Sequence, residues 1–154
     1  MSQILFFDEV VENAPIILEQ TTCLMCPERT TGGYLCVLEE ESGVPVLVLK
    51  VGMVPDEKKK KYFEFAQEKA NRLWLTHSHF LSSQSRDESQ NRFGGAIRTK
   101  DYIFSFSGLT EVADEAFSLA LAVFLKQLEI DEAIALGSIS QNLPIRELLQ
   151  LIKK

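Results

Sequence analysis

The sequence lacks an apolar run of about 18 residues, the length at which a membrane-spanning helix is considered. It also lacks the basic start of a secretory signal, because Met1-Ser2-Gln3 leads to Asp8-Glu9 after only four apolar residues. Basic residues are fewer than acidic ones, 16 against 22, which gives a net charge of −6. These absences predict a cytoplasmic protein with no membrane partner and no nucleic-acid partner.

Cysteine is scarce, and its odd count of three argues against a secreted disulfide framework. Cys23 and Cys26 form a single CxxC, and Cys36 lies in a predicted strand. A structural zinc site needs four ligands, so zinc would require a histidine in addition to the three thiols. We expect reduced thiols; a zinc site or a redox pair remains the alternative.

Histidine is scarcer still, with two residues, His77 and His79, at the end of a predicted helix. Metal-binding histidines on a helix share a face at spacings of three or four residues, not two. His77 also continues the apolar stripe of that helix. A core or capping role is the first interpretation, and a haem or metal ligand is the second.

The composition is that of a globular protein, with 154 residues and 45% hydrophobic side chains, and predicts a single domain over 1–154. Helical spacing over residues 4–14 predicts a helix that Pro15 ends, and residues 16–26 are ambiguous. Two apolar runs, 34–38 and 44–51, flank a polar turn and predict a hairpin.

Pro55-Asp56-Glu57 predicts the start of a second helix, because proline and acids favour a first turn. The basic block Lys58–Lys61 follows it. A solvated helix face is the first interpretation of the block, and a local patch for phosphate or a partner is the second. Residues 82–92 are polar without periodicity, which predicts a mobile loop.

The rest of the chain predicts a second hairpin over 94–106 and an apolar helix from about Thr110 to Leu128. Asn142-Leu143-Pro144 then precedes a final amphipathic helix. The predicted fold class is therefore α/β, an antiparallel sheet of two hairpins with helices packed against it.

Two glycine elements near the second hairpin suggest a ligand site: Gly94-Gly95 before it, and Ser107-Gly108 after it. Ser107-Gly108 would place backbone N–H groups at a helix N-terminus, which suits a carboxylate or phosphate, and Arg98 could add a bidentate partner. In the alternative, Gly108 supplies a bend, Ser107 or Thr110 caps the helix, and Arg98 is a surface residue.

The order of these elements resembles the GlcG/HbpS-like haem-binding and uptake family, over about residues 33–124. The resemblance rests on Lys69-Ala70, Gly94-Gly95, Ser107-Gly108 and Asp114-Glu115. It departs at Ala96-Ile97-Arg98, where the family has small apolar residues and proline. The resemblance implies a profilin-like fold and a haem or corrinoid as possible ligand.

Two functions follow. The first is a small-ligand-binding module for an anionic organic molecule or tetrapyrrole, formed as a homo-oligomer, with candidate residues Gly94, Gly95, Arg98, Ser107, Gly108, His77 and His79. The second is a protein-interaction or assembly protein that docks a partner through the helices over 110–128 and 143–153. An enzyme is the third alternative, although the sequence shows no nucleophile–base pair, P-loop, GxSxG or HExxH motif to indicate one.

Overall fold

The computed structural model describes residues 3–28 and 32–152 and contains a four-stranded antiparallel sheet in the order β2-β1-β4-β3. Its strands are β1 (Gly33–Glu39), β2 (Pro45–Val51), β3 (Ala96–Arg98) and β4 (Tyr102–Ser107). Its helices are α1 (Gln3–Met25), α2 (Asp56–Leu75), α3 (Glu111–Phe124), α4 (Ile130–Ile139) and α5 (Ile145–Ile152). The sequence-based prediction of an α/β fold with two hairpins, β1–β2 and β3–β4, is confirmed.

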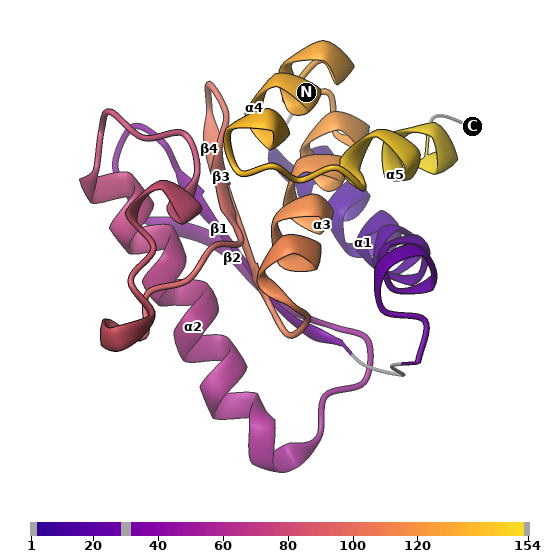
Figure 1. Cartoon of the computed structure of the whole chain (residues 1–154), viewed down its shortest axis with the longest axis horizontal. Helices are drawn as coiled ribbons and strands as arrows, with labels where there is room; N and C mark the ends of the chain where they lie inside the picture. The colour runs from indigo at the N-terminus through magenta and orange to yellow at the C-terminus, as the bar shows by residue number, and fades with distance from the viewer. Residues whose placement is uncertain (1–2, 29–31, 153–154) are drawn as a thin grey trace.

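Helices cover both faces of the sheet. Figure 1 shows α2 on one side and α1, α3 and α5 on the other. Because strand side chains alternate between faces, β1 supplies both cores. Leu35 and Val37 enter the larger core under α1 and α3, whereas Cys36 and Leu38 pack under α2. In residues 3–28 and 32–152, no helix combines the length and the apolar character that crossing a bilayer requires.

The first helix differs from the prediction, because α1 continues through Pro15 to Met25. Proline removes one backbone donor and crowds the preceding turn, which normally ends a helix. Here the apolar stripe continues on both sides of the proline, so that burial of the whole face outweighs the local cost. Its buried members recur at helical spacing: Val10, Ala14, Ile17, Leu18 and Thr21.

The apolar helix predicted to reach Leu128 ends earlier, at Phe124. Lys126 adopts a left-handed φ of 64°, the Lys126 amide donates to the Val123 carbonyl, and the Gln127 amide donates to the Ala122 carbonyl. This is the Schellman arrangement, which usually carries glycine at the left-handed position. Because lysine occupies this position in place of glycine, the sequence-based prediction did not end the helix at Phe124 and missed α4 as a separate helix.

The 82–92 segment, predicted as a loop, contains two short 3₁₀ helices, η1 (Ser82–Ser85) and η2 (Glu88–Gln90). Arg72 holds the segment from α2. Its guanidinium donates to the carbonyl oxygens of Ser82, at 2.8 Å, and Phe93, at 2.5 Å, and to the Ser85 hydroxyl. The structure thus fixes both ends of a segment that has no apolar periodicity of its own.

Candidate functional site

A buried ion pair connects the two helices that lie on opposite faces of the sheet. The Lys69 Nζ of α2 donates to Asp114 Oδ2 of α3 at 3.0 Å and to the Phe106 carbonyl of β4 at 2.9 Å. The two side chains are 3% and 4% exposed. Asp114 Oδ1 also accepts the Leu109 amide at 2.9 Å. The pair therefore fixes α2 to the loop that joins β4 to α3.

Gly95 makes room for this pair. A Cβ on Gly95 would lie 2.7 Å from Lys69 Nζ and 2.8 Å from the Phe106 carbonyl oxygen, and its φ is +135°. Only glycine adopts that backbone conformation without strain. Gly95 thus leaves free the space next to the Lys69 ammonium group. Gly94 instead donates its amide to Glu111 at 2.9 Å.

A pocket of about 310 Å³ opens beside the ion pair, between the N-terminal half of α2 and the β4–α3 loop. We call it the α2–α3 pocket. Its floor is polar, with Lys69, Asp114 and Ser107, and its walls include aromatic rings and two lysines of the basic block. These wall residues are Lys58, Lys61, Tyr62, Phe65 and Phe93.

The lysines of the basic block divide into two kinds. Two of them pair with acids about one turn away on α2: Lys59 with Asp56 at 2.8 Å, and Lys60 with Glu64 at 3.8 Å. The two that line the α2–α3 pocket, Lys58 and Lys61, form no ion pair with any described residue. Lys60 and Lys61 are exposed, as a solvated face requires, and Lys58 and Lys61 line the pocket that the second interpretation of the block needs.

The acids of the pocket are already neutralised. Asp114 is paired with Lys69, and the Nε–H of Arg86 is shared between the two carboxylate oxygens of Glu111, at 2.8 and 3.0 Å. Burial opposes the charge of Glu111, but hydrogen bonds from Arg86 and from the Gly94 amide outweigh it and lower its pKa. Among the described residues that line the pocket, Lys58 and Lys61 are thus the unneutralised charges, and both are positive.

Two of the backbone donors at the start of α3 are used by the protein itself. The Leu109 amide donates to Asp114, and the Ala113 amide donates to the Thr110 hydroxyl at 3.2 Å. Thr110 is thus the helix N-cap, one of the alternatives that the sequence left open. Ser107 and Gly108 do line the pocket, and the Ser107 hydroxyl has no protein partner among the described residues.

Glu115, one residue beyond the ion pair, is buried and has no cationic partner among the described residues. It accepts hydrogen bonds from Ser83 at 3.1 Å, Asn142 at 2.9 Å and Ser140. Burial raises the pKa of this carboxyl, and the three donors only partly offset that effect. The contacts join α3 to η1 and to the α4–α5 connection, which gives Glu115 an architectural role.

Arg98 lies outside the α2–α3 pocket, at the far end of β3. Its guanidinium pairs with Glu40 and donates to the carbonyl oxygens of Leu73, at 2.6 Å, and His79, at 2.9 Å. These contacts satisfy the carbonyl end of α2 with a cation, as the helix dipole favours. The bidentate ligand contact predicted for Arg98 is therefore not available in this structure.

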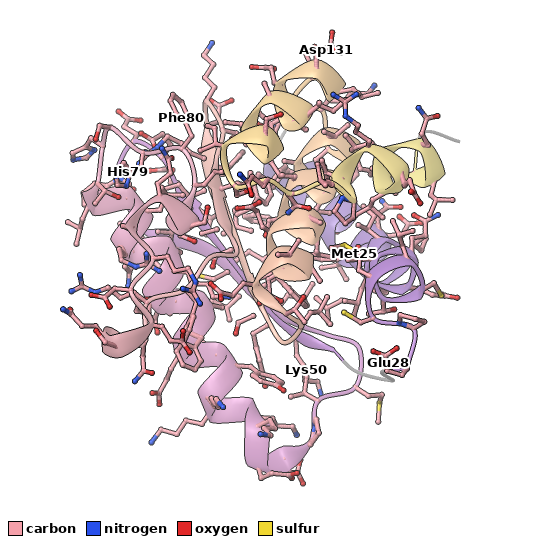
Figure 2. All side chains as sticks on the ribbon, in the orientation of Figure 1. Met25, Glu28, Lys50, His79, Phe80 and Asp131 are labelled. Carbon is pink, nitrogen blue, oxygen red and sulfur yellow. The ribbon has the colours of Figure 1, made fainter. Side chains whose placement is uncertain are left out.

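His77 and His79 also lie away from the pocket. They follow the C-terminal end of α2, about 20 Å along the helix from Lys61 at 1.5 Å per residue. His77 is exposed, and its ring centroid lies 5.6 Å from that of Trp74. His79 is labelled at the upper left of Figure 2. The sequence-predicted residues thus divide: Ser107 and Gly108 line the pocket, Gly94 and Gly95 lie next to it, and Arg98, His77 and His79 are not among its lining residues.

The pocket does not fit haem held by a histidine. The described residues of its lining include no histidine, cysteine or methionine, and among them Tyr62 is of a type that ligates haem iron. Within the described ranges, no cluster of three or more His, Cys, Asp or Glu side chains could hold a metal ion. The three thiols are free, and burial raises the pKa of Cys36 to about 11, which makes it a poor nucleophile.

The sequence-based reading missed the lysines and rings of the pocket as a set, although a signal was present. Lys58, Lys61, Phe65 and Lys69 recur at spacings of three and four residues, which places them on one face of α2.

Searches against protein-family models, curated proteins and solved structures found no match to this chain.

Proposed function

We propose that this protein binds a small anionic organic molecule in the α2–α3 pocket. The observation that carries the proposal is the division of the basic block: Lys58 and Lys61 line the pocket and form no ion pair with a described residue, while Lys59 and Lys60 are paired along the helix. Two unneutralised ammonium groups at one concave site attract a carboxylate or a phosphate, in a chain whose net charge is −6.

The pocket also suits an apolar body on the ligand. Phe65 and Phe93 pack edge to face with ring centroids 5.5 Å apart, and Tyr62 lies beside them in the lining. A volume of about 310 Å³ is at the small end of the range for ligand sites, which begins near 300 Å³. A single-ring acid or phosphate ester matches this volume better than a tetrapyrrole does.

The Ser107 hydroxyl supplies a neutral donor at the polar floor, next to the ion pair of Lys69 and Asp114. Because that pair is fixed by the Phe106 carbonyl and the Leu109 amide, the floor is formed before a ligand arrives. A preformed site loses less conformational entropy on binding. We therefore assign Lys69 and Asp114 to shaping the site, and Lys58, Lys61 and Ser107 to contacting the ligand.

The family resemblance is part of the proposal. The short elements on which it rests, Lys69, Gly95, Ser107-Gly108 and Asp114, converge on this one place in the fold. That convergence supports a GlcG/HbpS-like architecture with a different ligand. We further propose that the protein acts in the cytoplasm as a homo-oligomer.

The alternative function, docking of a partner through the two C-terminal apolar segments, finds less support. Residues Ala113 to Ala122 of α3 are all buried, and α5 packs its Ile145, Leu148 and Leu149 into the same core. Both helices therefore use their apolar faces within the chain.

The test is an NMR titration of the ¹⁵N-labelled protein with phenyl phosphate, with phenol and inorganic phosphate as matched probes of the two halves of the ligand. The proposal expects saturable amide shifts at Lys58, Lys61 and Ser107 with phenyl phosphate, weaker ones with inorganic phosphate, and none at these positions with phenol. Absence of shifts with phenyl phosphate at millimolar concentration, or shifts centred on another surface, would overturn it.

A further inference from the structure

The two edges of the sheet differ. At the β3 edge, Leu81 forms a bridge to Ile97, and the Arg98 amide donates to the Phe80 carbonyl at 2.9 Å. At the β2 edge, no described strand continues the sheet beyond Pro45–Val51. An open edge presents a row of backbone donors and acceptors that can pair with another strand.

The open edge is also apolar on its surface. The α2 helix packs on β1, β3 and β4, and β2 is not among its neighbours. Val48 of β2 is 45% exposed and Val44 just before the strand is 56% exposed. Lys50 is the one charged residue in β2, and Pro45, which lacks an amide donor, is the first residue of the strand.

Charges of opposite sign lie at the two ends of this edge. Glu41, in the β1–β2 turn, and Lys50, near the end of β2, are both exposed, and neither forms an ion pair with a described residue. An antiparallel pair of identical strands places the start of one beside the end of the other. The edge is therefore complementary to a second copy of itself.

We propose that two copies of this chain pair through β2, antiparallel about a two-fold axis near Val46, so that one sheet continues through both. In this register Val48 of one copy lies beside Val44 of the other, and Lys50 lies beside the turn that carries Glu41. The symmetry makes each contact twice, as in an isologous interface.

This inference rests on the homo-oligomer of the proposed function and names its interface. Its test needs no ligand. The test is sedimentation of the full chain and of charge-reversal variants, each checked for folding by circular dichroism. Wild type is expected to sediment as a dimer, at twice the 17.4 kDa chain mass. Lys50→Glu and Glu41→Lys should each weaken the dimer dissociation constant by about tenfold, since each places like charges together at two symmetric contacts.

The double variant E41K/K50E should restore the dimer, because it exchanges the two charges without removing either. Arg146→Glu and Glu147→Lys are the matched controls, since both residues are exposed on α5 and make the same charge changes away from β2. They should dimerise like wild type. A dimer that neither single reversal weakens, or that the double variant fails to restore, overturns this interface and leaves a homo-oligomer through another surface. A monomeric wild type overturns both.

Discussion

The ammonium group of Lys69 lies 3.0 Å from Asp114 Oδ2, and both side chains are almost completely buried. Removing one partner of a buried pair leaves the other charge without compensation, which costs about 3–5 kcal/mol. We expect Lys69→Met to lower the free energy of unfolding by that amount, measured by urea denaturation at neutral pH. The double variant K69M/D114L should recover most of the loss, since it removes both charges. A loss in the double variant equal to that in K69M would contradict this interpretation of the pair.

Gly95→Ala should destabilise the protein by about 2–4 kcal/mol, because it combines a strained backbone with a steric conflict. The added methyl group would lie 2.7 Å from Lys69 Nζ, at a φ of +135°. Gly94→Ala is the control, since its Cβ would meet Ser83 Cβ at 3.1 Å and its φ is not in the left-handed region. Thermal unfolding of both variants compares them directly, and equal losses would show that Gly95 has no special role.

Glu115 should make stability depend on pH with a definite sign. Burial raises its folded-state pKa above the ordinary value of 4.5, so the unfolded chain loses the proton first as pH rises. The contribution of this carboxyl to stability therefore falls with rising pH, from about 4.5 up through its raised folded pKa.

Urea denaturation of wild type and Glu115→Gln across this pH range measures that contribution. The stability of wild type relative to the variant should decrease as pH rises toward neutrality. Glu147→Gln, at an exposed position of α5, is the control and should show no such trend. If the stability of wild type relative to E115Q instead increased with rising pH, the raised folded-state pKa of Glu115 would be contradicted.

Arg98→Met should destabilise the protein without affecting ligand binding. The change leaves Glu40 without its partner and the Leu73 and His79 carbonyl oxygens without their donor, a loss of about 2–4 kcal/mol. Affinity for phenyl phosphate, measured well below the melting temperature, should stay within twofold of wild type. If affinity fell while stability held, Arg98 would be the ligand contact that the sequence alone suggested.

The fold was predictable where local signals and burial agree. The β1–β2 hairpin follows from two apolar runs around the polar turn that contains Gly43, and the β3–β4 hairpin from a similar pattern after Gly95. The errors came where tertiary contacts override a local rule. Pro15 lies within a helix because the buried stripe continues past it, and Lys126 takes a position where glycine is the usual signal.

The candidate site was only partly predictable for a similar reason. Ser107 and Gly108 were recognised from a local motif, and they line the pocket. Arg98 was included because it is close in sequence to Gly95, but three residues along a strand carry a side chain away from the pocket. The pairs of Lys59 with Asp56 and of Lys60 with Glu64 follow helical spacings of three and four residues. Which lysines of the Lys58–Lys61 block line the pocket depends on where α2 meets the β4–α3 loop. That arrangement cannot be read from the run of charges.

The most direct measurement compares the affinity of two double variants for phenyl phosphate. Lys58→Gln with Lys61→Gln removes the two unpaired charges of the α2–α3 pocket, whereas Lys59→Gln with Lys60→Gln removes the same charge from the paired positions beside them. We expect the first to weaken binding at least tenfold, or about 1.4 kcal/mol. The second should bind within about twofold of wild type, since Lys59 and Lys60 are not among the described residues that line the pocket. Equal affinities for the two variants would contradict the assignment of the anion site to Lys58 and Lys61.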